Sequence, residues 1–166
     1  MPDEKQTPRN LTDSVRAYFD SQGWQYRYDE EKGFFGMLVK VSEEMEACKA
    51  YTVIRDEERF TTFVTLPFRV PEEQRPLAAR FISAANYQLL LGCFEMDFRD
   101  GDVQYKTTCL CGNVRLDPEH IRRYIEVGLQ MARDCGPMLD DLIYKNVPLE
   151  DVLARLAKLR RDQKKR

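Results

Sequence analysis

The stretch "NYQLLLGCFEMDFRDGDVQYKTTCLC", residues 86–111, decides the fold because it specifies a β-hairpin. Apolar and polar side chains alternate on both sides of the dipeptide Asp100-Gly101, which is a favoured hairpin turn. The apolar set is Phe94, Met96 and Phe98 before the turn and Val103, Tyr105, Thr107 and Cys109 after it. A period of two is that of a β-strand, so the sequence predicts a hairpin with one buried face.

A two-residue loop at Asp100-Gly101 would fix the register of this hairpin. We then expect Glu95 and Lys106 to form an opposite-charge pair across the strands. The same register directs Phe94, Met96 and Phe98 toward the helices, because a slip of one residue would turn that face to water. The other expected pairs are Arg99 with Asp102, Phe98 with Val103, and Met96 with Tyr105.

The remaining chain divides into helical and strand patterns. A first helix starts near Asn10 or Thr12 and ends at Gly23. Further helices are expected over 71–89, over 117–134 with Asp117 as N-cap, over 138–146 after a break at "CGP", and over 148–162. Strands are expected at 24–28, 34–41, 49–56 and 60–66, the last closed by Pro67. The order of helix, three or four strands, helix, two strands and helices indicates an α+β fold built on an antiparallel sheet.

Length and composition are those of an ordinary globular chain. The 166 residues suggest a disordered leader at 1–9, a single α+β domain over 10–146, and an amphipathic C-terminal helix with a basic tail over 147–166. No apolar run approaches the roughly 20 residues of a membrane span, and the N-terminus is polar without a signal-peptide segment. We therefore expect no membrane association and a cytoplasmic location.

The charge pattern argues against a nucleic-acid-binding domain. The formal net charge is −2, although residues 158–166 carry six basic residues and one acidic residue. A uniformly basic surface is thereby excluded. The basic tail could contact nucleic acid or an acidic partner, but a frayed helix end is the commoner explanation. The aromatic residues lie on predicted strands and do not interleave with basic residues along the sequence, as a single-strand binder would require.

Residues that could carry chemistry are few. The five cysteines are odd in number and set among apolar residues, which indicates buried reduced thiols. Cys109 and Cys111 share a strand face, but a tetrahedral metal site needs a second ligand pair. The lone His120 lies in the first turn of a helix, and Glu95 and Asp97 lie on the outer face of the hairpin, where charges are usually solvated. We expect no enzyme, no metal and no cofactor.

Two segments carry a resemblance to a known family. "LAARFISAANYQLLLGCFEMDFRDGDVQYKTTC" and "LDPEHIRRYIEVGLQMARDCGPML" resemble the YbjN-domain family over about residues 11–145. The matching positions are Asn86 at a helix end, Gly92 before a strand, the turn Asp100-Gly101, and Pro137 after a helix. The resemblance implies an α-β-β-β-α-β-β-α fold similar to the small chaperones of bacterial type III secretion, which commonly dimerises. It also implies a bacterial regulator of sensory transduction or stress, with no reaction attributed to it.

Two classes of function follow. The favoured one is a non-enzymatic protein-binding or regulatory module, a homodimer with a protein client that the sequence does not identify. The alternative is a small-ligand-binding or catalytic domain whose site is assembled from scattered residues. The helix 148–162 lies outside the family pattern and carries an apolar stripe that must be covered by its own domain, a second copy or a client. That candidate contact is Leu149, Val152, Leu153, Leu156 and Leu159.

Overall fold

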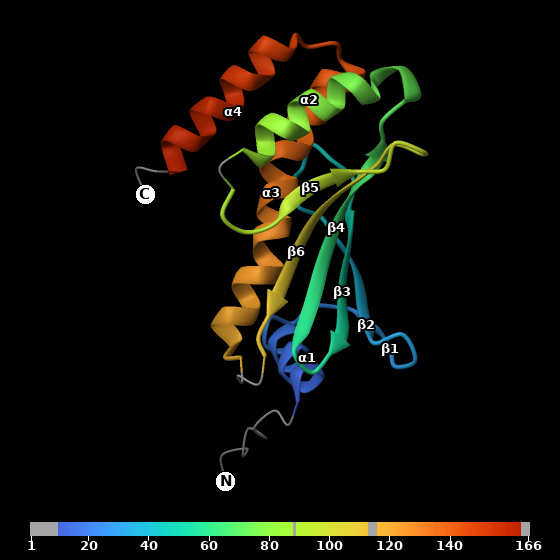
Figure 1. Ribbon diagram of the computed structural model, residues 1–166, viewed down its shortest axis with the longest axis vertical. Helices are drawn as coiled ribbons and strands as arrows, with labels where there is room; N and C mark the ends of the chain where they lie inside the picture. Colours follow the sequence, from blue (N-terminus) through green and yellow to red (C-terminus); the bar gives the residue numbers. More distant parts are fainter. Residues whose placement is uncertain (1–9, 88, 113–115, 164–166) are drawn as a thin grey trace.

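The computed structural model describes residues 10–87, 89–112 and 116–163, so the expected leader at 1–9 and the last basic residues lie outside the described part (Figure 1). The elements in chain order are α1 Leu11–Ser21, β1 Arg27–Asp29, β2 Phe34–Val39, β3 Cys48–Asp56, β4 Arg59–Arg69, a 3-10 turn η1 Glu72–Gln74, α2 Arg75–Asn86, β5 Cys93–Met96, β6 Asp102–Leu110, α3 Pro118–Tyr144 and α4 Leu149–Gln163. None of the described helices has the length and apolar character needed to cross a membrane.

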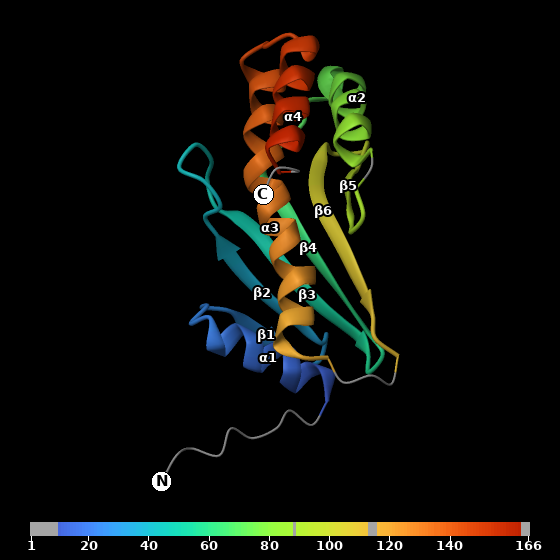
Figure 2. The ribbon, with the colours of Figure 1, turned by 90° about the vertical axis from the view of Figure 1, so that its left-hand side faces the viewer.

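Six strands form one sheet in the order β1-β2-β3-β4-β6-β5, and every neighbouring pair is antiparallel. The long helix α3 lies along one side of this sheet, with α1 at one end and α2 and α4 at the other (Figures 1 and 2). The predicted α+β class is confirmed, and four strands precede α2. The described helices lie on one side of the sheet, and none of them covers its other side.

The core lies between the sheet and α3 and has two parts. At one end α1 packs its Val15 and Phe19 against Phe35 of β2, Phe60 of β4 and Ile121 of α3. At the other end α2, α3 and α4 enclose a larger cluster that includes Phe81, Val64, Tyr105, Leu139 and Val152. Because α3 contributes to both clusters, it joins the two ends of the molecule. Asn10 and Asp117 cap α1 and α3, each accepting a backbone N–H at 2.8 Å.

The helix break predicted at "CGP" is wrong, because α3 continues through Cys135, Gly136 and Pro137 to Tyr144. A proline in a helix removes one hydrogen bond. Here the buried face runs on past it through Cys135, Leu139 and Leu142, so packing outweighs that loss. Two other boundaries also differ: the second helix ends at Asn86, and β4 runs on through Pro67 where its ladder with β6 is irregular.

The predicted register of the hairpin is wrong by two residues. Met96 pairs with Val103 and Glu95 with Gln104, which leaves a loop of residues 98–101. Asp97 holds this loop, since its carboxylate accepts the Arg99 N–H and its carbonyl accepts the Gly101 N–H, both at 2.8 Å. A shift of two preserves the faces, so Phe94 stays buried, and Lys106 still pairs with Glu95 along the diagonal. Phe98, however, lies in the loop and is 57% exposed.

The apolar stripe of α4 is covered within the chain. Val152 and Leu156 are buried, and Leu149, Leu153 and Leu159 are half-buried, against α2 and α3. Arg160 fastens the far end of the helix, because its Nη2 donates to the carbonyls of Ala84, Ala85 and Tyr87 at 2.8–2.9 Å. These carbonyl groups lie at the C-terminal end of α2, where the helix itself supplies no hydrogen-bond donors for them. A dimer through this stripe would first have to separate α4 from α2 and α3.

Candidate protein-binding face

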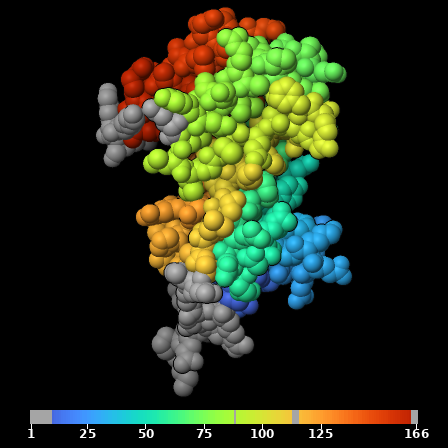
Figure 3. Space-filling model, in the orientation of Figure 1, coloured from blue at the N-terminus to red at the C-terminus, as the bar shows by residue number. Residues whose placement is uncertain are grey.

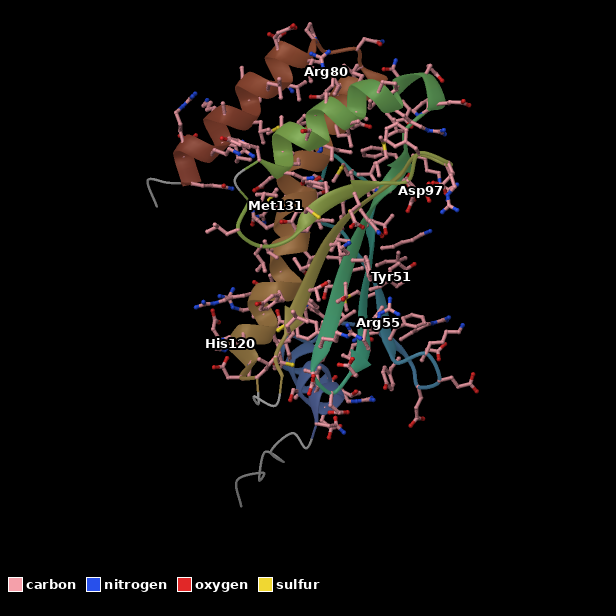
Figure 4. All side chains as sticks on the ribbon, viewed as in Figure 1. Tyr51, Arg55, Arg80, Asp97, His120 and Met131 are labelled. Atoms are coloured by element: carbon pink, nitrogen blue, oxygen red, sulfur yellow. The ribbon has the colours of Figure 1, made fainter. Side chains whose placement is uncertain are left out.

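The open face is the side of the sheet that no described helix covers. Sheet registers place three rows of side chains across it. The central row runs from Arg27 through Gly36, Tyr51 and Phe63 to Lys106, and its neighbours contain Phe34 with Val53 and Leu38 with Lys49. Figure 4 shows Tyr51 and Arg55 projecting from β3 on the side away from α3. Aromatic and basic residues therefore do come together, across strands instead of along the sequence.

An apolar groove of about 540 Å³ lies on this face over β1, β2 and β3. Its floor is Gly36, and the rings of Phe34 and Tyr51 meet edge to face beside it at 6.1 Å between centroids. A side chain at Gly36 would lie 3.2 Å from the Phe34 ring and 3.5 Å from the Tyr51 ring, so glycine keeps the groove open. Leu38, 71% exposed, forms one wall. Leu38, Phe34 and Tyr51 together make this groove a contiguous apolar surface, and such surfaces mark binding sites more often than a single exposed side chain does.

The backbone of Leu38 is unpaired at the edge beside this groove. The Ile54 N–H donates to the Gly33 carbonyl at 2.8 Å. Because bonded pairs alternate along an antiparallel ladder, Gly36 and Leu38 turn their N–H and C=O groups away from β3. Gly36 pairs there with Arg27, at which β1 begins. No hydrogen bond among the described residues reaches the N–H or C=O of Leu38.

The opposite edge of the sheet is closed by Asn86. Its side-chain amide donates to the Phe94 carbonyl at 2.9 Å and accepts the Phe94 N–H at 2.7 Å. These are the two bonds that a neighbouring strand would make, so Asn86 takes the place of a strand beside β5. The two edges of the sheet therefore differ: the end of α2 blocks the β5 edge, whereas Leu38, which lines the groove together with Gln25 and Tyr26, has no backbone hydrogen bond among the described residues.

The other positions of the family pattern have structural roles. Gly92 and Gly101 have positive φ angles of 78° and 76°, and neither has room for a Cβ atom. The carboxylate of Asp100 accepts the Asp102 N–H at 3.0 Å and so shapes the hairpin loop. Pro137 lies inside α3. None of these residues borders the groove.

The residues considered for catalysis do not form a reactive site. Lys106 pairs with Glu95, and the hydrogen bonds from Arg99 lower the pKa of Asp97 to about 2. Both carboxylates are thus engaged by cations instead of sharing a proton. His120 is exposed and its Nδ1 lies 3.0 Å from the capping carboxylate of Asp117. Among residues 10–87, 89–112 and 116–163, no three metal-binding side chains gather at one point.

Two further hollows lie away from this groove, one of them at the hairpin end of the open face. One, of about 620 Å³, is polar and follows the hairpin from Glu95 to Gln104. The other, of about 250 Å³, lies between α2, α3 and α4, beside Met131, Leu156 and Arg160. The second is smaller than an ordinary ligand site. The first brings together four carboxylates, and each has a basic partner: Lys106 for Glu95, Arg99 for Asp97, and Arg69 for Asp100 and Asp102. Burial, and then the neighbouring Asp100, raise the pKa of Asp102. Figure 3 shows the blue and teal strands and the yellow hairpin on one side of the molecule, opposite the orange and red helices.

The cysteines provide a first test of the structure. Burial raises the pKa of Cys135 to about 12 and those of Cys48 and Cys109 to about 11, whereas Cys93 is half-buried on the open face. The thiolate is the reactive form, so Ellman's reagent at about pH 8 should modify one thiol quickly and all five only after unfolding. Cys93→Ser should abolish the fast reaction. Rapid modification of several thiols would contradict the packing.

The comparisons with known proteins agree with this fold. The family model YbjN, described as "Putative bacterial sensory transduction regulator", matches residues 12–141. The crystal structure of YbjN from E. coli, named there "a putative transcription regulator", has a TM-score of 0.50 at 14% identity and covers 76% of this chain and 91% of that one. The structure of the HopA1-SchA chaperone-effector complex has a TM-score of 0.48 at 15% identity, covering 70% and 84%. No curated protein matches the chain in sequence.

The family match includes α1, the whole sheet, α2 and most of α3, and ends before α4. It contains the positions Asn86, Gly92, Gly101 and Pro137 at which the sequence resembles the family pattern. The solved YbjN structure shares the fold at low identity. The resemblance seen in the sequence is thereby confirmed, and this protein belongs to the YbjN family.

Proposed function

We propose that this protein is a non-catalytic regulatory module that binds an extended segment of a protein partner as an added strand at the Leu38 edge of β2. The observation that carries the proposal is the unpaired N–H and C=O of Leu38 beside an apolar groove. In strand addition the main chain supplies hydrogen bonds and grooves for alternate side chains supply specificity. The closed β5 edge directs such a partner to β2.

The assembly state belongs to the same proposal. We expect a cytoplasmic homodimer that holds its client segment in extended form. Since α2 and α3 cover the α4 stripe, a dimer contact would use another surface. Light scattering decides between a monomer of 19.6 kDa and a particle of twice that mass. The monomer mass at every concentration would contradict the homodimer.

The binding edge is tested at Leu38. A photo-crosslinking amino acid at this position in the native host, followed by mass spectrometry, identifies the captured segment, which is then synthesised and titrated. We expect Leu38→Pro to weaken binding about tenfold, because proline lacks the outward N–H that the added strand needs. Leu38→Thr keeps that N–H and should retain most of the affinity.

Hydrogen exchange supplies the control for this experiment. The Leu38 amide should exchange rapidly in the unbound protein and slowly with the peptide bound. The β2–β3 ladder does not use this N–H, so circular dichroism of Leu38→Pro should stay close to that of the parent. If the peptide binds Leu38→Pro as tightly as it binds the parent protein, the result would contradict the strand-addition proposal.

A further inference from the structure

The charges around the groove are of one sign. Arg27 and Lys49 are the charged residues that line it, and both are exposed cations. Neither has an ion-pair partner among the described residues, and the same is true of Arg55 nearby on β3. Toward the other end of the open face Glu95 neutralises Lys106, and Asp56 neutralises Arg59. Positive charge without an ion-pair partner therefore gathers at the groove and beside it on β3.

The two cations flank an apolar centre. Arg27 stands opposite Gly36, and Lys49 stands opposite Leu38, one row further along β2. Between them lie Gly36, Leu38 and Tyr51, and Phe34 lies one row further along β2 on the side away from Lys49. In an extended chain, side chains two residues apart point to the same side, about 7 Å apart. Arg27 and Lys49 are one row apart along the strands and two strands apart across the sheet, so carboxylates that flank an apolar side chain of an extended segment would present negative charge to both cations.

We propose that the segment bound at the Leu38 edge is acidic, with an apolar side chain that enters the groove over Gly36 and carboxylates that meet Arg27 and Lys49. This inference rests on the proposed function and adds the chemistry of the partner. Charge complementarity at an exposed rim acts mainly on selectivity and on the rate of association. It favours an acidic peptide over a neutral one of the same shape.

Two other occupants fit the surface less well. A second copy joined at Leu38 would bring the same unneutralised cations of both copies toward one edge, which is repulsive. A single-stranded nucleic acid needs ring faces on which its bases can stack. Phe34 and Tyr51 are instead half-buried and packed edge to face. The hairpin end of the sheet also carries carboxylates, Asp97, Asp100 and Asp102, that would repel phosphates.

The test uses three labelled peptides of about eight residues, built around Glu-Thr-Leu-Thr-Glu, its Gln counterpart and its Lys counterpart. Fluorescence anisotropy with the full chain should show that the Glu peptide binds about tenfold more tightly than the Gln peptide. Its advantage should shrink as salt rises from about 0.1 M to about 1 M, where screening shortens from about 10 Å to about 3 Å. The double variant Arg27→Glu with Lys49→Glu should reverse the preference, so that the Lys peptide binds best.

A matched control separates the groove from the overall charge. Lys158→Glu with Arg161→Glu changes the net charge by the same amount on exposed residues of α4, remote from the groove. This variant should keep the parent preference for the Glu peptide. If it loses that preference as the groove variant does, bulk charge explains the selectivity and the inference is overturned.

The remaining outcomes distinguish this inference from the proposed function. Equal binding of the Glu and Gln peptides, with protection of the Leu38 amide by both, would overturn the acidic partner and leave strand addition standing. Failure of all three peptides to bind or to protect that amide would count against both. If an oligothymidylate binds more tightly than the Glu peptide and displaces it, the groove is a nucleic-acid site. If the protein forms a dimer that excludes the peptide, the groove is a contact between two copies. Either outcome would overturn the inference.

Discussion

Gly101→Ala should lower the free energy of unfolding by about 3 kcal/mol. Gly101 has a φ angle of 76°, where an L-residue costs about 1–2 kcal/mol. A Cβ atom there would lie 2.0 Å from the carbonyl oxygen of Val70 and 2.9 Å from its nitrogen. That backbone is buried and donates its own N–H to the Gly101 carbonyl at 2.8 Å. Either the hairpin loop or the end of β4 must move.

The control for this variant is Gly23→Ala. Gly23 also has a positive φ angle, 65°, but an added Cβ there would meet no atom within 4 Å. Gly23→Ala should therefore lower the free energy of unfolding only by the backbone cost of about 1 kcal/mol. Urea unfolding of both variants isolates the contact with Val70 as the difference. Equal losses would show that the loop relaxes away from Val70 and that the left-handed backbone alone decides the cost.

The hairpin shows which features of the fold the sequence could predict and which it could not. The alternation of apolar and polar residues correctly predicted that Phe94 is buried. The predicted register was wrong by two residues, but a shift of two keeps each side chain on its face, so Glu95 and Lys106 still form a pair. The predicted loop length was wrong because side chains determine the conformation of this turn. The Asp97 and Asp100 carboxylates bind backbone N–H groups and stabilise a four-residue loop that the dipeptide rule does not foresee.

The candidate binding face could not be predicted in the same way. Phe34, Tyr51 and Lys106 are far apart in the sequence, and only the strand registers bring them onto one surface. One local signal was present: "FFGMLV" of β2 is apolar at positions that alternate between both faces, although one face of this sheet is open. The unpaired backbone of Leu38 had no signal, because it depends on where β1 begins.

The role of Asn86 joins the family pattern to the proposed function. The sequence marked the position only as the residue at which a helix ends. The structure places its side-chain amide against both backbone groups of Phe94, which is 4% exposed. An amide side chain carries a donor and an acceptor side by side, as a peptide group does, so it closes an edge that charged or apolar residues would leave open. The chain thereby offers one binding edge instead of two.

Asn86→Ala should accordingly lower the free energy of unfolding by about 2–3 kcal/mol, because it leaves the N–H and C=O of Phe94 without partners at a buried position. The Phe94 amide should lose its protection from hydrogen exchange. An opened β5 edge can also pair with another chain, so light scattering should show self-association above the 19.6 kDa monomer or above the dimer, whichever the parent forms.

The control is Gln22→Ala, which removes a side-chain amide at an exposed position and should change the free energy of unfolding by less than about 0.5 kcal/mol. Continued protection of the Phe94 amide in Asn86→Ala would mean that another group closes this edge, and the difference between the two edges would then not depend on Asn86.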